Sequence, residues 1–214
     1  MKSKLSKYLY WLIAIFPFIL SAAFYSRLPE RMAIHWDAAG NANGFASKTM
    51  AAFGVPALFV AAILFVNFRI STDPNQQNID RSPQLKLIRK WGVAAIANLG
   101  QGAMIFKAMN YKFNISTFLL TLVGLLIIAM GNYLPKCKYN YTLGIKLPWT
   151  LASEENWRKT HRFAGFLWII GGIFMIVSAF VPSTWMIIFI VLILAAVPAA
   201  YSYSIYRKEN QSSK

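Results

Sequence analysis

Six apolar stretches of 18 to 20 residues run through this chain, and its charged residues lie almost entirely between them. A helix rises about 1.5 Å per residue, so about 20 residues cross a hydrocarbon core about 30 Å thick. A backbone exposed to lipid must satisfy its own N–H and C=O groups, which requires a helix. We therefore predict an all-α integral membrane bundle of six transmembrane helices, at Tyr8–Tyr25, Met50–Phe68, Trp91–Met109, Ile115–Leu134, Phe163–Val181 and Thr184–Tyr203.

The basic residues predict the orientation of these spans. Of the 22 Lys and Arg residues, 17 lie in the two tails and in the second and fourth loops, and the other 5 lie on the opposite side, four in loops and Lys107 near the outer end of the third span. The second loop contributes Arg69, Arg81, Lys86, Arg89 and Lys90. Cytoplasmic loops carry the excess of Lys and Arg, so both termini are predicted to be cytoplasmic. A net charge of +15 would suggest nucleic-acid binding in a soluble domain. In short membrane loops it instead suggests contact with the lipid bilayer, and no direct nucleic-acid binding is predicted.

The first apolar stretch has a second interpretation. Basic residues from Lys2 to Lys7 followed by an apolar run also fit the front of a secretory signal. The run is long, however, and no clean A-x-A-like cleavage site follows at Ser21–Ala23, which favours a span. Cys137 is the only cysteine, so no disulfide framework or Cys-based metal cluster is available. We predict a single membrane domain over residues 1–214.

Small and polar residues within the spans predict how the helices meet. Gly124 and Gly131, like Gly165 and Gly172, are seven residues apart, so each pair shares a helix face on which another helix can approach closely. The prolines within spans should kink them unless neighbouring helices satisfy the freed carbonyls; these are Pro17, Pro56 and Pro198. Asn98 and Gln101 should point inward, either for interhelical hydrogen bonds or to line a solute path.

The outer loop, residues 26–49, is predicted to be compact and ordered. It contains the turn formers Asp37, Gly40 and Asn41. Counting Asp37 as the first position of a calcium loop places Lys48 where a bidentate glutamate is required, so no metal site is predicted. His35 and Trp36 more often anchor such a loop at the headgroup level than bind a ligand.

The fourth loop, residues 135–162, is predicted to be cytoplasmic. Ser153 is a candidate N-cap, and the helix it begins should run past Trp157 and His161, which share a face, into the fifth span. Trp149 and Trp157 are predicted to lie in the interfacial belt, while the neighbouring cations meet anionic headgroups. A specific binding site is equally compatible with this concentration of aromatic and basic residues.

The sequence predicts no enzyme. The two histidines fall on opposite sides of the predicted bilayer, and no H-E-x-x-H or G-x-S-x-G motif or phosphate-binding glycine loop is present. No cofactor is predicted. A small-solute carrier or channel is the alternative, although no Asp or Glu lies within a predicted span to relay protons.

Two segments resemble a known family. Asn140-Tyr-Thr-Leu-Gly-Ile-Lys-Leu-Pro-Trp-Thr-Leu151, followed by Trp157-Arg-Lys-Thr-His-Arg-Phe163, resembles the SdpI family of bacterial immunity proteins. Members have a similar N-x-x-x-G-I-R-x-P-W-T-L stretch and then T-H-R-F; here Lys146 stands where Arg is usual, which keeps the charge and loses the bidentate fork. The outer segment, with Leu28-Pro29-Glu30, Ile34-His35-Trp36, Gly40 and Ser47-Lys48, resembles the uncharacterised domain that often opens such proteins.

The resemblance implies a multipass protein of the bacterial cytoplasmic membrane that gives resistance to a secreted, membrane-active peptide toxin. It also implies a receptor that holds a transcriptional repressor at the membrane. The partner-binding candidates that it implies in the cytoplasmic loop are Asn140, Gly144, Lys146, Pro148, Trp149, Thr150, Trp157, His161 and Arg162. The toxin-facing candidates are Pro29, His35, Trp36, Gly40 and Lys48.

Overall fold

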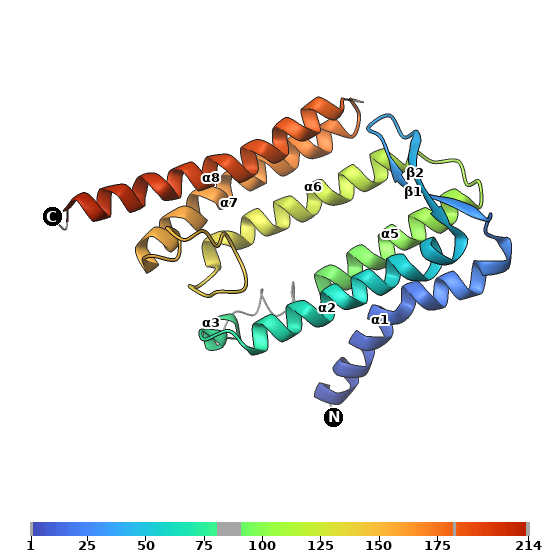
Figure 1. Ribbon diagram of the computed structural model, residues 1–214, viewed down its shortest axis with the longest axis horizontal. Helices are drawn as coiled ribbons and strands as arrows, with labels where there is room; N and C mark the ends of the chain where they lie inside the picture. Colours follow the sequence, from blue (N-terminus) through green and yellow to red (C-terminus); the bar gives the residue numbers. More distant parts are fainter. Residues whose placement is uncertain (1, 81–90, 182, 213–214) are drawn as a thin grey trace. The chain divides into compact units, whose positions relative to one another are not determined.

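The computed structural model describes residues 2–80, 91–181 and 183–212, and these are mostly helical (Figure 1). Within this described part of the chain, five helical segments are long and apolar enough to cross a membrane. The longer helices are α1 (Lys2–Phe24), α2 (Val55–Ser71), α5 (Val93–Ala108), α6 (Ile115–Tyr133), α7 (Glu154–Ser178) and α8 (Thr184–Ser212). Short helical turns at Tyr25–Arg27, Met50–Gly54 and Leu134–Lys136 extend α1, α2 and α6, and α3 (Gln76–Asp80) follows α2.

The predicted third span coincides with α5, whose 16 residues are fewer than a full crossing requires. The six spans and the cytoplasmic termini therefore stay predictions. Of the basic residues that suggested the orientation, Arg81, Lys86, Arg89 and Lys90 lie outside the described residues. The remaining predicted spans are confirmed as helices: α1 begins earlier and α8 ends later than the predicted spans, while α7 begins at Glu154, as expected from the Ser153 N-cap.

The chain forms two compact units. The first comprises the described parts of Met1–Phe68 and Leu87–Leu119. In it, α1 packs against α5, and Ile63 of α2 joins their shared apolar cluster. A second cluster joins Met104 and Ile105 of α5 to Leu28 and Met32, near the outer loop.

The outer loop departs from the all-α prediction because it contains a β-hairpin. Strands β1 (Arg31–Trp36) and β2 (Ala42–Ser47) pair antiparallel, in the register Arg31–Ser47 to Trp36–Ala42 (Figure 1). The turn formers were recognised from the sequence, but the strands were not, because each has only six residues and β2 shows no regular alternation of apolar side chains. The predicted compact, ordered loop is confirmed.

The second unit comprises the described parts of Arg69–Lys86 and Leu120–Lys214. Within it, α7 packs against both α6 and α8 (Figure 1). The two predicted glycine pairs face each other across the contact of α6 with α7. A Cβ added to Gly124 would lie 2.7 Å from the carbonyl oxygen of Gly172, and one on Gly131 would lie 2.8 Å from that of Gly165. The predicted close approach on these faces is therefore confirmed.

Each proline within a span has a neighbouring side chain that satisfies the carbonyl it leaves free. Because proline has no N–H, Pro17 and Pro198 free the carbonyls of Ile13 and Leu194, four residues earlier. Asn98 Nδ2 donates to the Ile13 carbonyl at 2.9 Å, and Trp168 Nε1 donates to the Leu194 carbonyl at 3.1 Å.

The carbonyl that Pro56 leaves free also accepts from a side chain, but here the preceding turn is a π-helix. Met50–Gly54 is a π-helix, in which each carbonyl accepts from the N–H five residues on, so Pro56 frees the carbonyl of Ala51. Gln101 Nε2 donates to that carbonyl at 3.1 Å, and also to Ser21 Oγ at 2.9 Å. The side-chain amides of α5 thus serve interhelical hydrogen bonding, which favours the packing interpretation over a solute path.

This arrangement predicts that Asn98 and Pro17 are energetically coupled. Asn98→Leu should destabilise the protein by about 1–3 kcal/mol, because the half-buried Ile13 carbonyl loses its donor. In a Pro17→Ala background the backbone N–H of residue 17 can take over, so the same substitution should cost much less. Thermal denaturation of the four proteins in detergent measures this coupling. Equal losses in both backgrounds would show that Asn98 does not act through this carbonyl.

Candidate functional site

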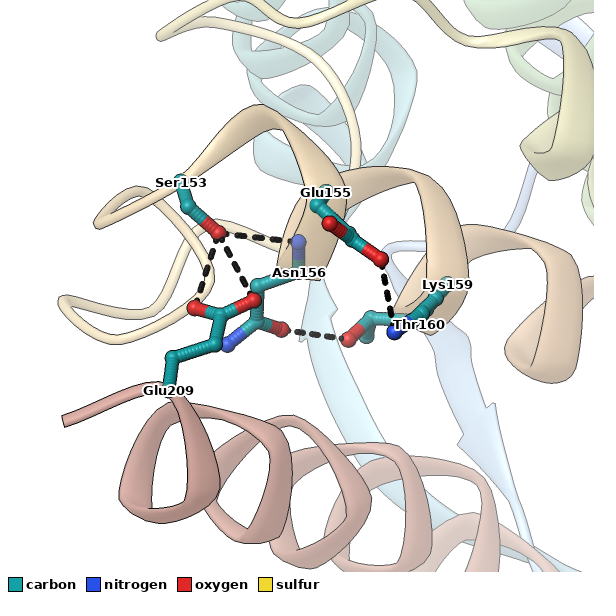
Figure 2. Close-up of polar contacts among 6 residues, drawn as sticks. All are labelled: Ser153, Glu155, Asn156, Lys159, Thr160 and Glu209. Atoms are coloured by element: carbon teal, nitrogen blue, oxygen red, sulfur yellow. Dashed lines mark hydrogen bonds and ion pairs between the residues drawn. The ribbon is translucent and has the colours of Figure 1, made fainter. Parts of the chain in front are cut away.

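The fourth loop and the start of α7 form an ordered polar assembly in the second unit. Ser153 caps α7, as predicted: its Oγ accepts from the Asn156 N–H at 3.0 Å (Figure 2). The Ser153 hydroxyl also donates to the carboxylate of Glu209 in α8, at 3.0 and 3.2 Å. In the first turns of α7, Glu155 pairs with Lys159 at 2.7 Å (Figure 2). The cap thus joins the loop to the C-terminal end of α8.

Asn156 is the centre of the buried part of this assembly. Its Nδ2 donates to the carbonyls of Trp149 and Ser202, each at 2.9 Å. Its Oδ1 accepts from the hydroxyls of Thr160 and Ser202, again at 2.9 Å (Figure 2 shows the Thr160 contact). Thr150 completes the network through a 2.6 Å bond to Ser202 Oγ. Both donors and both acceptor positions of the amide are therefore used, and all four of these side chains are buried.

Sequence reasoning found Thr150 but missed Asn156, Thr160 and Ser202. Asn156 and Thr160 are four residues apart, and side chains at this spacing are neighbours on a helix surface. Their hydrogen bond along α7 could therefore have been predicted. The contribution of Ser202 could not, because it depends on how α8 packs against α7.

His161 is buried against Trp157, with ring centroids 3.9 Å apart and planes inclined by 25°. Its Nε2 accepts from the backbone N–H of Ile145 at 3.0 Å, and its Nδ1 lies 2.8 Å from the Trp157 carbonyl. An amide nitrogen can only donate and a carbonyl oxygen can only accept, so the ring is neutral with its proton on Nδ1. Both ring nitrogens are occupied, which leaves no free base or metal ligand on this residue.

Gly144 lies over the His161 and Trp157 rings. Its φ of +104° is a conformation that favours glycine, and a Cβ there would collide with His161 Nε2. A larger residue at this position would push the loop away from the histidine that holds it.

Asn140 and Asp73 hold the rest of the loop. Asn140 is fully buried; its Oδ1 accepts from the N–H groups of Thr142 and Leu143, and its Nδ2 donates to the Lys138 carbonyl. Asp73, which follows α2, accepts from the Tyr141 N–H at 2.9 Å and from the Thr142 hydroxyl at 2.6 Å. Asp73 was not among the predicted residues, because nothing in its local sequence indicates a partner 68 positions away.

The placement predicted for Trp157 in an interfacial belt is wrong. Trp157 is only 2% exposed, and its Nε1 donates to the Cys137 carbonyl at 2.8 Å. Trp149 is half-buried; it donates to the Ala199 carbonyl of α8 at 3.2 Å and meets the Tyr203 ring edge-on. Both Trp rings therefore pack inside the second unit and help to hold the loop in place, which the interfacial interpretation did not predict.

The predicted loop residues therefore separate into two groups. Those that form the interior of the assembly are Asn140, Thr150, Trp157 and His161, with Trp149 half-buried. Gly144, Lys146, Pro148 and Arg162 are exposed. Lys146 Nζ donates to the Thr142 carbonyl at 2.6 Å, which holds the ammonium group at the loop surface. Only the exposed group is available to a partner.

The predicted outer residues lie on and beside the hairpin of the first unit. Pro29 and His35 are exposed, and His35 Nδ1 contacts Asn43 Oδ1 across the strands. Trp36 is half-buried against the apolar cluster beneath the hairpin. Lys48 Nζ lies 3.6 Å from Glu30 and 4.6 Å from the centre of the Tyr25 ring. The hairpin therefore offers His35 and Pro29 to solvent, while Trp36 and Lys48 secure it.

The turn of the hairpin is organised by Asp37 and Gly40. The Asp37 carboxylate accepts from the N–H groups of Asn41 and Ala39, each at 2.9 Å, and these bonds, those of Asn41 foremost, lower its pKa. Gly40 has a φ of +90°. Both carboxylate oxygens of Asp37 serve the turn itself, so they are not free to ligate a metal. Among the described residues, no group of three or more His, Cys, Asp and Glu side chains could hold a metal ion.

Cys137 is buried, and this burial raises the pKa of its thiol from 9.0 to about 11. The thiolate is the reactive form, so at pH 8 its population falls about a hundredfold relative to an unshifted thiol. We expect a membrane-impermeant maleimide to leave Cys137 unmodified in the native protein and to modify it after denaturation in SDS. Mass spectrometry of the intact protein measures the extent of modification. Rapid labelling of native protein would contradict the burial of this thiol.

An unreactive Cys137 allows introduced cysteines to report the predicted orientation. Ala42 on β2 and Ala152 before the Ser153 cap are both exposed. In intact spheroplasts, we expect Ala42→Cys to be labelled at once and Ala152→Cys to be labelled only after permeabilisation. The reverse pattern would overturn the predicted topology.

Comparisons with known proteins match both segments that carry the resemblance. Residues 136–202 match the SdpI/YfhL protein family, and residues 12–60 match the domain of unknown function DUF1648. Immunity protein SdpI of Bacillus subtilis (strain 168) is 27% identical over 205 residues, which cover 94% of this chain and 96% of that protein. No solved structure matches significantly.

The matched SdpI/YfhL segment contains Asn140, Asn156, His161 and Ser202, so the buried centre of the polar assembly falls within it, while Asp73 and Glu209 lie outside it. The DUF1648 segment contains the hairpin and most of α1. The predicted resemblance to the SdpI family is thereby confirmed, and the chain is a multipass protein of the cytoplasmic membrane with its SdpI/YfhL segment at residues 136–202.

Proposed function

We propose that this protein protects its cell from a secreted, membrane-active peptide toxin, and that it does so by binding. The observation that carries the proposal is the similarity to an immunity protein over nearly the whole length of both chains. The similarity extends over the hairpin segment, the spans and the polar assembly. The two proteins are therefore alike over nearly their whole length, and not only in one shared domain.

The chemistry of the assembly supports binding over catalysis. The polar atoms of Asn156 and His161 are used in internal hydrogen bonds, and His161 is neutral with both nitrogens occupied. The thiol of Cys137 is buried and weakly acidic. The polar groups of Asn156 and His161 thus hold the loop in place and are not free to act on a substrate. On this basis we propose that the protein is not an enzyme.

The hairpin is the surface that we propose for the toxin. Beside Pro29 and His35 it exposes two apolar side chains, Ile34 at 41% and Phe45 at 52%. Arg31 lies over the Phe45 ring, 5.8 Å from its centre. Exposed apolar groups next to a cation suit an amphipathic peptide that arrives at the membrane surface.

The exposed residues of the fourth loop are the surface that we propose for a soluble repressor inside the cell. Lys146 and Pro148 lie at the loop surface. A basic surface of this kind suits an acidic face of a partner. The presence of a repressor gene beside the gene for this protein would support this part of the proposal.

Expression in a toxin-sensitive strain tests the proposal directly. We expect survival of the toxin to rise at least tenfold when the protein is present in the membrane. Phe45→Ser should reduce protection without changing the amount of protein, whereas Lys146→Ala should leave protection intact and reduce retention of the repressor. Unchanged killing by the toxin, with the protein confirmed in the membrane, would defeat the assignment for that toxin.

A further inference from the structure

A basic hollow lies where α6 ends and α7 begins, and its lining is separate from the buried hydrogen-bond network of Asn156. It has a volume of about 480 Å³ and is lined by Pro135, Arg158, Lys159 and Arg162. Pro135 ends the apolar segment Ile115–Lys136, and the three cations lie in the first turns of α7. A second hollow of about 470 Å³ shares Pro135 and Arg158 and adds the cations Lys136 and Lys138 and one carboxylate, Glu154. Cations thus concentrate around one place at the end of two spans.

The charges of the first hollow are incompletely compensated. Lys159 pairs with Glu155 at 2.7 Å. Among the described residues, however, no carboxylate oxygen lies within 4.0 Å of the guanidinium nitrogens of Arg158 or Arg162. These two residues are four apart, so they are neighbours on the helix surface and repel each other. An anion placed between them would turn this repulsion into two favourable contacts.

The face of α7 that continues from the hollow is apolar and exposed. Lys159, Arg162, Phe166 and Ile173 are spaced i, i+3, i+7 and i+14, so they share one face of the helix. Phe166 is 68% exposed and Ile173 is 51% exposed. A ligand that follows this face would meet cations first and then an apolar surface beginning one turn further along.

We infer that this hollow binds the headgroup of an anionic phospholipid, with its acyl chains along Phe166 and Ile173. A phosphodiester accepts paired hydrogen bonds from guanidinium groups, which makes arginine suited to hold it. Basic pockets between transmembrane helices are known sites for such headgroups. A free phosphate would use the same cations but not the apolar face, and an acidic peptide would not need the membrane. The lipid is favoured because the cations of the hollow are followed along the same face of α7 by exposed apolar side chains.

Native mass spectrometry of the full-length protein in detergent tests the inference, with phosphatidylglycerol, phosphatidylcholine and inorganic phosphate as probes. We expect one phosphatidylglycerol to bind at least tenfold more tightly than phosphatidylcholine, and more tightly than phosphate. Arg158→Gln with Arg162→Gln should weaken phosphatidylglycerol binding at least tenfold. Arg207→Gln, which removes one exposed cation of α8 away from the hollow, should change it less than twofold.

A second variant and a spectroscopic check keep the result interpretable if the double Gln variant folds poorly. Arg158→Lys with Arg162→Lys keeps the charge and loses the bidentate geometry, so binding should fall between the native and Gln values. Circular dichroism of each variant reports its helicity. Equal lipid binding by native and Lys- or Gln-substituted proteins would overturn the inference. So would phosphate or an acidic octapeptide that binds as tightly as phosphatidylglycerol.

Discussion

Alanine at Gly172 is expected to destabilise this protein, although alanine ordinarily stabilises a helix interior by about 1 kcal/mol relative to glycine. A Cβ on Gly172 would lie 2.7 Å from the Gly124 carbonyl oxygen and 2.9 Å from the Ile128 nitrogen of α6. Both are backbone atoms, so neither can rotate away, and the helices would have to separate. Overpacking of this kind costs about 1–3 kcal/mol.

The thermal midpoint in detergent measures this effect. For a chain of this size a change of 1 kcal/mol corresponds to about 2–4 °C, so Gly172→Ala should lower the midpoint by several degrees. Gly172→Leu should prevent accumulation in the membrane, because a larger side chain forces the helices further apart. Gly100→Ala in α5 is the matched control: no atom lies within 4 Å of its added Cβ, so its midpoint should hold or rise. If Gly172→Ala were as stable as Gly100→Ala, the close approach of α6 and α7 would be disproved.

Asn156→Ala is expected to cause the largest loss of stability among single polar substitutions in the second unit. It would leave the carbonyls of Trp149 and Ser202 without the donors that they have now, and the hydroxyls of Thr160 and Ser202 without their acceptor. Each buried group left unsatisfied costs about 1–3 kcal/mol. Relaxation and water entry would offset part of this sum, so we expect a net loss of about 3–5 kcal/mol.

Chemical or thermal unfolding of the purified protein measures this loss, and Asn132→Ala provides the control. Asn132 is an exposed amide in α6, so its removal should change stability by less than about 0.5 kcal/mol. Thr150→Val and Ser202→Ala should each cost less than Asn156→Ala, since each removes fewer bonds of the same network. A loss at Asn156 no greater than that at Asn132 would mean that the network does not hold the loop to α8.

The membrane-spanning helices followed from the sequence because lipid imposes a simple rule on every residue within it. A run of about 20 apolar residues has to be helical, whatever it packs against. The Ser153 cap and the positive φ of Gly144 were predictable for a related reason, because each depends on a few neighbouring residues. The hairpin was missed because its strands are short and β2 shows no regular alternation of apolar side chains.

The candidate site was predicted less completely. The family resemblance indicated Asn140, Thr150, Trp157 and His161, but it could not say that they are buried and hold one another in place. Asp73 and Ser202 were not predicted at all, because their partners are 68 and 46 positions away along the chain. The prolines show the same limit: the sequence predicted free carbonyls in the spans, but not that Asn98, Gln101 and Trp168 satisfy them.

The amino-acid sequence alone determined that this chain enters a bilayer, which segments form its long helices, and which helix faces are small enough to pack closely. These properties arise from local apolar content, from turn and cap chemistry, and from residue spacing. Only the tertiary structure decided which polar side chains are interior and which remain exposed to a partner, as with His161 and Lys146. The reason is that a hydrogen bond needs both its donor and its acceptor in place, and here the two come from segments that meet only after the helices have packed.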